Sequence, residues 1–209
     1  MRCLARLGLS LCLILTACSE PARFEALPPG STVLAFGNSV TYGTGAGAGQ
    51  DYPSQLAQRT GWKVINAGIP GDLARDAGKR LPALLQQHAP DLVIVELGGN
   101  DFLRKRPASA VKRELDAILS QVINNEAIPV LVAVPRLSLL RARTGTLKDD
   151  GLYQALADEK DIVLVTDAFS DILSEPELRS DPIHPNADGY RRLAGEIAVV
   201  LTQQGLLAD

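Results

Sequence analysis

The chain has 209 residues, of which 46% are hydrophobic, 22% charged and 4% aromatic, with a formal net charge of −3. This length suits one domain with a sizeable core, and 18 Gly and 13 Pro residues without a period exclude collagen-like and disordered classes. No run of 18 or more apolar residues occurs, so no membrane-spanning helix is predicted, and the lack of a long basic block argues against nucleic acid as a partner.

The first 18 residues have the pattern of a targeting segment. Arg2 and Arg6 precede an apolar run at residues 7–15 that is too short to span a bilayer. The run ends in the four residues Leu15–Cys18, which resemble the bacterial lipobox, where the cysteine receives a lipid and becomes the first residue after cleavage. We therefore expect a signal peptide at residues 1–17 and a lipidated Cys18. An ordinary secretory signal and an N-terminal core helix are the alternatives.

A lipid on Cys18 would change what the rest of the chain can do. The mature chain would have 209 − 17 = 192 residues and no other cysteine, because Cys3 and Cys12 leave with the signal peptide. Disulfides and cysteine-based metal sites are then excluded, and the chain has only two histidines, so no metal site is expected. Acyl chains would hold the protein, expected as a monomer, at a membrane, and Ser19 favours the outer membrane, facing the periplasm.

A proline-containing tether at residues 18–30 precedes a single domain at residues 31–209. In this domain, short continuous apolar runs alternate with helical stretches. The runs lie at residues 33–36, 64–65, 92–97, 130–134 and 162–165, and the helical stretches at 53–60, 73–87, 108–125, 152–158 and 188–203. Continuous runs are typical of strands buried on both faces of a parallel sheet. The pattern predicts an α/β fold, a three-layer α/β/α arrangement with a five-stranded, mostly parallel sheet.

Three candidate site residues lie at the carboxyl ends of three of these strands. Ser39 comes directly after the first strand, Gly68 ends the second, and Asn100 follows the third in Gly98-Gly99-Asn100-Asp101. Because the carboxyl ends of parallel strands meet at one edge, these residues converge there. A serine can act as a nucleophile, and an Asn amide with backbone N–H groups can stabilise a negatively charged oxygen. Each residue taken alone could equally be a helix cap or a turn former.

Asp181 and His184 lie just before the final helix, in Asp181-Pro182-Ile183-His184-Pro185. A serine nucleophile needs a neutral imidazole, which in turn needs an acceptor at its other nitrogen. Asp181 can supply that acceptor from three residues away, although it could also be a turn residue or the partner of an Arg. His88 lies at a helix end and is interpreted as a surface residue.

A leucine-rich segment follows the fourth strand, again at the carboxyl edge. We hypothesise that Leu137, Leu139 and Leu140 line an acyl pocket while neighbouring arginines meet a polar head group. The alternative is a short amphipathic helix packed on the surface.

The four blocks together resemble the SGNH/GDSL hydrolase superfamily, and within it the bacterial periplasmic thioesterase, lysophospholipase and arylesterase group. The blocks are Gly37-Asn38-Ser39, Asn66-Ala67-Gly68-Ile69-Pro70-Gly71-Asp72, Gly98-Gly99-Asn100-Asp101 and Asp181-Pro182-Ile183-His184-Pro185. The resemblance implies a flavodoxin-like fold with Ser39 as nucleophile, His184 as general base and then acid, and Asp181 as orienting carboxylate. It also implies an oxyanion hole from the backbone N–H groups of Ser39 and Gly68 and the side chain of Asn100.

What the resemblance implies for function is a serine esterase without a cofactor. It would hydrolyse carboxylic esters or thioesters, with a small ester or lysolipid as substrate, through an acyl-enzyme intermediate. The alternatives are a carbohydrate or peptidoglycan O-acetylesterase and a non-catalytic envelope lipoprotein. One departure from the family pattern is Asn38, where the family usually has Asp.

Overall fold

The computed structural model describes residues 23–136 and 147–208. A five-stranded sheet forms the centre, with every neighbouring pair parallel and the strand order β2-β1-β3-β4-β5. The strands are β1 (Thr32–Gly37), β2 (Lys63–Gly68), β3 (Leu92–Glu96), β4 (Ile128–Val132) and β5 (Val163–Val165). The predicted five-stranded parallel sheet and its flavodoxin-like order are thereby confirmed.

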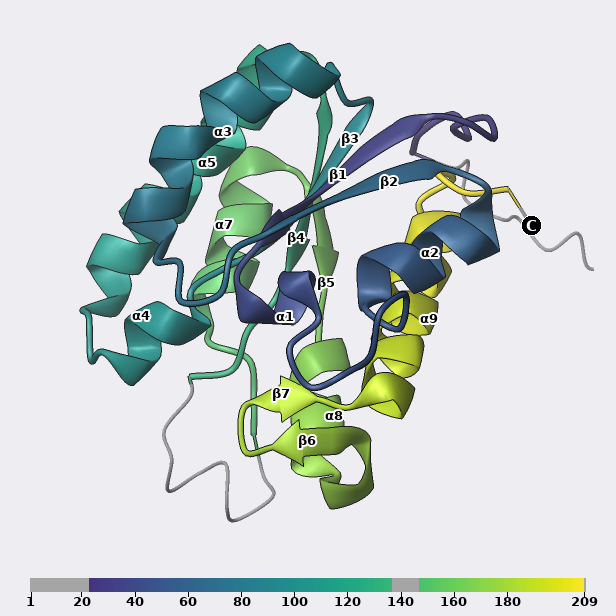
Figure 1. Cartoon of the computed structure of the whole chain (residues 1–209). Coiled ribbons are helices and arrows are strands. Elements are labelled where there is room, and N and C mark those ends of the chain that lie inside the picture. Colours follow the sequence, from purple (N-terminus) through teal and green to yellow (C-terminus); the bar gives the residue numbers. More distant parts are fainter. Residues whose placement is uncertain (1–22, 137–146, 209) are drawn as a thin grey trace, which may run out of the picture.

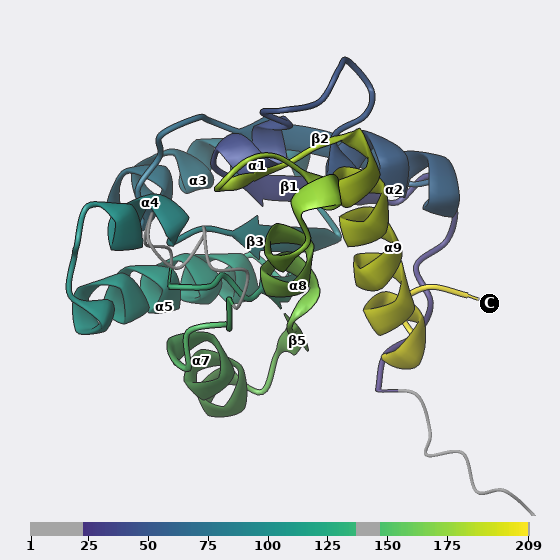
Figure 2. The same ribbon diagram turned by 90° about the horizontal axis from the view of Figure 1, so that it is seen from below.

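Helices cover both faces of the sheet (Figures 1 and 2). One face carries α3 (Ala74–His88), α5 (Ala108–Asn124) and α7 (Leu152–Lys160), and the other carries α2 (Tyr52–Thr60) and α9 (Ala187–Gln203). These five helices agree with the predicted helical stretches. The short elements were not predicted, namely α1 (Ser39–Tyr42), α4 (Gly99–Leu103), α8 (Ala168–Ser174), η1 (Pro176–Leu178), β6 (Arg179–Asp181) and β7 (His184–Pro185).

The core follows from the apolar patterns of these elements. In β3 every residue is buried, and in β1 every residue after Thr32 is buried, as expected for strands in the middle of a covered sheet. In α9 the buried face includes Leu193, Ile197 and Leu201, which follow one another at intervals of four residues. Each such side chain stabilises the fold by about 1.5–3 kcal/mol relative to an exposed one.

The strand order creates the place for a site. From β1 the chain moves outward to the edge strand β2 and then returns to β3 on the other side of β1. The connections leaving β1 and β3 therefore diverge, and a crevice opens between them at the carboxyl ends. Gly37 pairs in register with Glu96 of β3 and Gly68 of β2, so the loops that follow all three strands begin at the same level.

The first described residues pack at the opposite end of the sheet. Phe24 N–H donates to the carbonyl of Gln204 at 3.1 Å, and Leu27 N–H donates to that of Leu206 at 2.9 Å. The carbonyl of Leu27 accepts from Trp62 Nε1 at 3.3 Å. The second half of the predicted tether is therefore bound to the domain. The predicted signal peptide and Cys18 lie outside the described residues, and within the described ranges no helix is long and apolar enough to cross a membrane.

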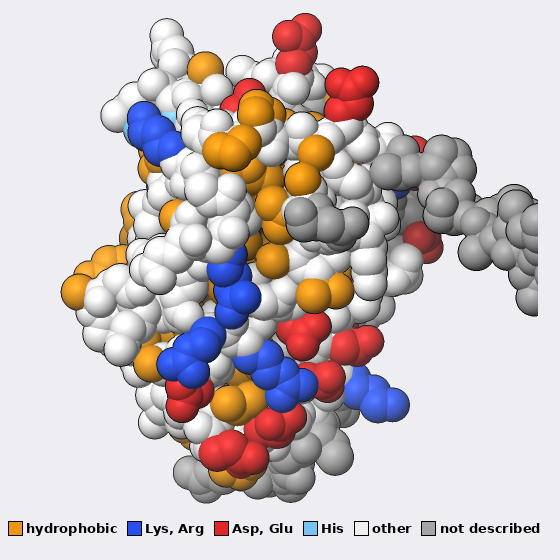
Figure 3. Space-filling model, turned by 90° about the vertical axis from the view of Figure 1, so that its right-hand side faces the viewer, with side chains coloured by type: hydrophobic (Ala, Val, Ile, Leu, Met, Phe, Trp, Pro, Cys, Tyr) orange, Lys and Arg blue, Asp and Glu red, His pale blue; other side chains and the backbone are white. Residues whose placement is uncertain are grey.

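Figure 3 shows the face that α2 and α9 form, where Lys and Arg side chains lie beside Asp and Glu. Arg191 pairs with Asp188 at 2.7 Å, and Arg192 pairs with Glu175 at 2.7 Å. Charges of opposite sign are thus interspersed on this face.

Candidate active site

Ser39 is placed by the end of β1. Asn38 caps α1, because its Oδ1 accepts the backbone N–H of Val40 at 3.0 Å, and Ser39 is the first residue of that helix. A Cβ on Gly37 would overlap Thr41 Oγ1 and lie 2.5 Å from the carbonyl oxygen of Glu96. Only glycine therefore lets the chain turn from β1 into α1 this closely against β3.

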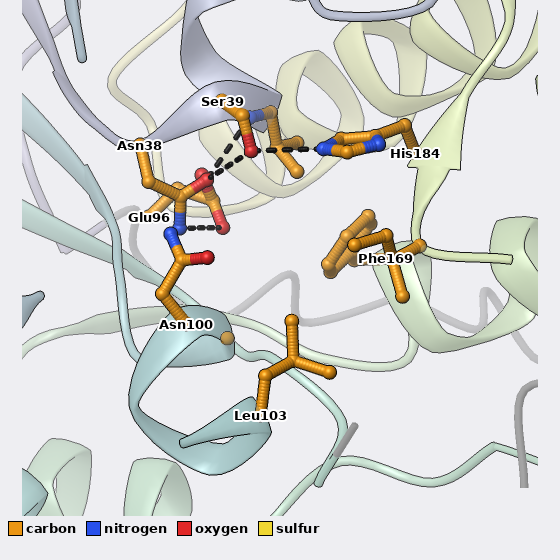
Figure 4. A pocket seen from close by; sticks show the side chains of 10 residues that line it. Asn38, Ser39, Glu96, Asn100, Leu103, Phe169 and His184 are labelled. Atoms are coloured by element: carbon orange, nitrogen blue, oxygen red, sulfur yellow. Dashed lines mark hydrogen bonds between the residues drawn. The ribbon is translucent and has the colours of Figure 1, made fainter. Parts of the chain in front are cut away.

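The short hairpin of β6 and β7 brings His184 to Ser39. His184 Nε2 lies 2.9 Å from Ser39 Oγ, and His184 Nδ1 lies 2.7 Å from Asp181 Oδ2. Figure 4 shows the contact between Ser39 and His184. A carboxylate only accepts hydrogen bonds, so Nδ1 carries the ring proton and Nε2 is free to accept the proton of the Ser39 hydroxyl. The three residues meet as the sequence predicted, although 145 positions separate Ser39 from His184.

Asp181 is held in its charged form. Its Oδ1 accepts the backbone N–H groups of Ile183 at 2.8 Å and His184 at 2.9 Å, and its Oδ2 accepts the His184 ring. Partial burial alone would raise the pKa of the Asp181 carboxyl, but these hydrogen bonds and the His184 charge outweigh it and lower the pKa below its ordinary value. Asp181 is therefore an anion wherever His184 has to act as a base.

Asn100 faces the same pocket from the start of α4 (Figure 4). One hydrogen of its side-chain amide is donated to the carbonyl of Asp72 at 3.1 Å, which fixes the amide plane. The second hydrogen is left for a ligand, because an amide nitrogen carries two. Asn100 thus stands where the sequence placed it, with its donor oriented by the loop that follows β2.

The structure does not support Gly68 as an oxyanion donor, and this part of the prediction is corrected. The N–H of Gly68 donates to Oδ1 of Asn66, two residues earlier, at 3.0 Å, in an Asx turn. A Cβ on Gly68 would overlap the backbone nitrogen of Tyr42, so this glycine serves the close packing of β2 against α1.

An apolar wall completes the pocket, and sequence reasoning missed it. It is formed by Leu103 of α4, Phe169 of α8 and Ile183 of the β6–β7 hairpin. Figure 4 shows Leu103 and Phe169 on the side of the pocket away from Asn38. Leu103 follows the Asn100 block and Ile183 lies inside the Asp181–His184 block, so both could have been suspected. Phe169 was missed because α8 was not predicted, although its apolar residues have helical spacing.

Two other parts of the prediction stay open. Leu137, Leu139 and Leu140 lie outside the described residues. Among the residues that are described, no group of three or more His, Cys, Asp and Glu side chains could hold a metal ion.

A nucleophilic hydroxyl, an imidazole within hydrogen-bond reach, a carboxylate behind it and an oriented amide donor are the equipment of a serine hydrolase. They lie at the carboxyl edge of a flavodoxin-like sheet, which is where ligands bind in such folds. The fold and the site together define an enzyme that transfers acyl groups through a serine.

Comparison with known proteins agrees with this class. The family model of the GDSL-like Lipase/Acylhydrolase family matches residues 35–192. Thioesterase 1/protease 1/lysophospholipase L1 of Escherichia coli (strain K12) is 35% identical over 170 residues, which are 80% of this chain and 81% of that protein. Arylesterase of Vibrio mimicus is 30% identical over 141 residues, or 67% of this chain and 70% of that one. The crystal structure of TesA superposes with a TM-score of 0.70 at 26% identity, and covers 83% of this chain and 99% of that chain.

The chain belongs to the GDSL-like lipase/acylhydrolase family and is a serine hydrolase that acts on ester bonds. The resemblance inferred from the four sequence blocks is thereby confirmed.

Proposed function

We propose that Ser39, His184 and Asp181 form the catalytic triad through which the enzyme hydrolyses carboxylic esters and thioesters. The observation that carries this proposal is the continuous chain from Ser39 Oγ to His184 at 2.9 Å and on to Asp181 at 2.7 Å. His184 takes the proton of the Ser39 hydroxyl as Oγ attacks the carbonyl carbon, and then gives it to the departing alcohol or thiol. Water activated by His184 next cleaves the acyl-enzyme and releases the acid.

The negative oxygen of the tetrahedral intermediate needs donors that are already in place. Ser39 supplies its backbone N–H, which has no partner within α1 because Ser39 is the first residue of that helix. Asn100 supplies its free amide hydrogen.

We assign the third donor to Gly71 in place of Gly68. Residues 69–72 form a turn in which Asp72 N–H donates to Ile69 carbonyl at 3.1 Å. Gly71 has a φ of 85°, as the third residue of a type II turn requires, and Pro70 precedes it. The N–H of Gly71 has no partner within such a turn. The carbonyl of Asp72 contacts Asn100, so the turn lies next to the second donor.

The acyl group of the substrate would lie against Leu103, Phe169 and Ile183, which form the apolar wall beside Ser39. The hypothesis that Leu137, Leu139 and Leu140 line the acyl pocket stays a prediction, because they lie outside the described residues. The relatives are named thioesterase, lysophospholipase and arylesterase, which supports thioesters, lysophospholipids and aryl esters as the substrate classes to test.

Cys18 is the proposed site of a lipid anchor, and the proposed location is the outer membrane, with the domain facing the periplasm. The support is the sequence pattern of Arg2, Arg6, the apolar run and the motif that ends in Cys18. The enzyme would act there as a monomer. Acyl-CoA is a cytosolic metabolite, so oxygen esters are the better candidates for its natural substrate.

The proposal can be tested with p-nitrophenyl esters from acetyl to palmitoyl, a lysophospholipid and an acyl thioester. Ser39→Ala should lower kcat on every hydrolysed substrate by up to about a millionfold. Ser109→Ala is the matched control, because Ser109 is exposed on α5, and it should leave kcat and KM unchanged. An Ser39→Ala protein that keeps its activity would refute the proposed nucleophile. The ratio of long-chain to acetyl ester hydrolysis separates a lysophospholipase-like enzyme from an O-acetylesterase.

A further inference from the structure

A buried carboxyl group lies directly beneath the nucleophile turn, defined here as residues 38–41. Glu96 ends β3 and is 1% exposed. Its Oε1 accepts the side-chain amide of Asn38 at 3.4 Å, and its Oε2 lies 3.2 Å from Thr41 Oγ1. Figure 4 shows Glu96 beside Asn38 at the floor of the pocket. The Oδ1 of the same Asn38 accepts from Val40 N–H and lies 3.4 Å from Ser39 Oγ.

Glu96 contacts both ends of the nucleophile turn from a different strand. The side chains of Asn38 at the first position and Thr41 at the last are each hydrogen-bonded to it. The turn therefore cannot shift relative to β3 without breaking bonds to one side chain. Since β3 also leads into the loop that carries Asn100, Glu96 couples the position of the nucleophile to that of an oxyanion donor.

We propose that Glu96 is a positioning residue for Ser39, which holds the nucleophile turn as a neutral acid and whose ionisation sets the alkaline limit of activity. The inference rests on the proposed function, because Ser39 is its point of action. Glu96 itself touches no reacting atom in this mechanism.

The surroundings of Glu96 favour the neutral acid. Burial raises the pKa of the Glu96 carboxyl to about 8, although hydrogen bonds from Asn38 and Thr41 oppose the rise. None of the Lys and Arg side chains in the described part of the chain pairs with it. The other titratable groups around it are the phenols of Tyr52, Tyr153 and Tyr190, from α2, α7 and α9. Burial first, and then the charge of Glu96, raises the pKa of these tyrosines, so they stay neutral. His184 faces Glu96 across the pocket.

The hydrogen bonds around Glu96 can be satisfied in both protonation states. Thr41 Oγ1 lies 3.2 Å from the hydroxyl of Tyr52. The neutral acid donates from Oε2 to Thr41, which donates to Tyr52. When Glu96 ionises, both bonds reverse, with Tyr52 donating to Thr41 and Thr41 to Glu96. What remains is an added negative charge in a buried site, next to the place where the substrate oxygen must itself become negative. Ionisation should therefore lower kcat without unfolding the turn.

The residue at position 38 should influence the pH at which this alkaline limit falls. With Asp at position 38, as in the usual family pattern, a second carboxyl would stand at the distance of 3.4 Å that separates Asn38 Nδ2 from Glu96 Oε1. Two carboxyls so close share one proton, which raises the higher of their two pKa values. Asn38→Asp should therefore move the alkaline limit to higher pH, while the acceptor oxygen that caps α1 is retained.

The test is the pH profile of kcat on a p-nitrophenyl ester, corrected for spontaneous hydrolysis, for the purified protein and two variants. The unmodified protein should lose activity by up to about tenfold per pH unit above its inflection near the pKa of about 8. In Glu96→Gln, which keeps an acceptor and a donor but cannot ionise, this alkaline decline should be absent when each profile is scaled to its own maximum. In Asn38→Asp the inflection should move up by about one pH unit or more. An alkaline decline in Glu96→Gln that coincides with that of the unmodified protein would overturn the proposal.

A second readout does not depend on ester hydrolysis. A folded pKa above the unfolded value means that the unfolded state loses its proton first, so stability falls as pH rises from the unfolded pKa to about 8 and then levels off. As pH rises over this range, the urea midpoint of Glu96→Gln should therefore increase relative to that of the unmodified protein. A constant difference across the range would show that Glu96 is already ionised and would overturn the proposal. If the gain with pH is seen but the protein hydrolyses no ester, the proposed function is refuted instead.

Discussion

At the scale of single residues, the Asp181–His184 pair shows how a short segment can build half of a catalytic site. The residues are three positions apart, and the β6–β7 hairpin turns between them. One carboxylate oxygen accepts two backbone N–H groups of the turn and the other accepts the imidazole. The same side chain therefore shapes the turn and orients the base.

This arrangement predicts the effect of Asp181→Asn. Asn keeps an acceptor for the turn but cannot stabilise the imidazolium that forms when His184 takes the proton, so kcat should fall by roughly 10²- to 10⁴-fold with a small change in KM. Asp188→Asn is the control, because Asp188 is an exposed residue of α9 whose side chain pairs with Arg191. Steady-state kinetics on a soluble ester measure both variants. A loss smaller than about threefold would show that His184 does not need Asp181.

The lowered pKa of Asp181 adds a pH signature. A depressed carboxyl pKa stabilises the fold above the unfolded value, and this contribution is lost as pH falls through the folded pKa. The difference in urea midpoint between the unmodified protein and Asp181→Asn should therefore be present at about pH 6 and vanish in acid below the ordinary carboxyl pKa. A difference that persists unchanged in acid would contradict this assignment.

At the scale of the elements, Asp101 ties three helices together next to the site. It is fully buried in α4, its Oδ2 accepts the N–H of Ala74 at 3.1 Å, and its Oδ1 pairs with Arg106. Ala74 begins α3, and the residue before it, Leu73, provides no side-chain cap. Arg106 also pairs with Glu114 of α5 at 2.6 Å. Asp101 thus caps a helix that precedes it in the chain, and through α4 it supports Asn100.

Substitution of Asp101 should lower the stability of the fold more than it lowers the rate of ester hydrolysis. Asp101→Ala leaves the N–H of Ala74 without its acceptor, so the free energy of unfolding should fall by about 1–3 kcal/mol. Asp116→Ala on α5 removes a half-exposed partner of Lys160 and should cost at most about 1 kcal/mol. Urea unfolding monitored by circular dichroism measures the free energy of unfolding of both variants. Equal losses in the two variants would mean that Asp101 is no more important than a surface ion pair.

At the scale of the whole molecule, the N-terminal segment and the active site lie at opposite ends of the sheet. Phe24 and Leu27 bind the chain just after α9, near the amino ends of the strands, whereas Ser39 follows the carboxyl end of β1 (Figure 1). The gap from Cys18 to Arg23 is 23 − 18 = 5 residues, or at most about 18 Å of extended chain. β1 alone, with six residues, is about 20 Å long. A lipid on Cys18 would therefore hold the pocket away from the membrane, toward substrates in the aqueous phase.

Lengthening the tether tests this orientation. An insert of about 30 Gly and Ser residues between Ala22 and Arg23 spans roughly 30 Å and keeps the contacts of Phe24 and Leu27. It should raise hydrolysis of a lysophospholipid embedded in the same vesicle several-fold and leave a soluble ester unaffected. The same insert after Asp209 is the control and should change neither rate. Equally fast hydrolysis of the embedded lipid with and without the N-terminal insert would show that the pocket already reaches the bilayer.

The sequence predicted best those features that depend on short stretches of chain. Continuous apolar runs marked β1 and β3 because both strands are covered on two faces, whereas the edge strand β2, with exposed Lys63 and Asn66, was recognised over only two of its six residues. The three residues of the proposed triad were predicted because they belong to short sequence blocks that occur in a fixed order and resemble a known family.

What the sequence could not predict depends on tertiary packing. Gly68 and Gly71 lie in one block, and only the bond from Gly68 to Asn66 shows that the N–H of Gly68 is already used. Phe169 reaches the pocket from α8, and this helix of seven residues is too short for its apolar spacing alone to predict it. The role inferred for Glu96 required knowing that β3 places its last side chain beneath the nucleophile turn.

The central claim, that Ser39 is the nucleophile activated by His184, is tested most directly by covalent trapping. The protein is treated with diethyl p-nitrophenyl phosphate, an organophosphate that transfers one phosphoryl group to an activated serine, and is then analysed by intact mass and peptide mapping. We expect a single adduct, located on Ser39, that is absent in Ser39→Ala and forms at least about a hundredfold more slowly in His184→Ala. A single adduct on another residue, or an unchanged adduct in Ser39→Ala, would show that Ser39 is not the nucleophile.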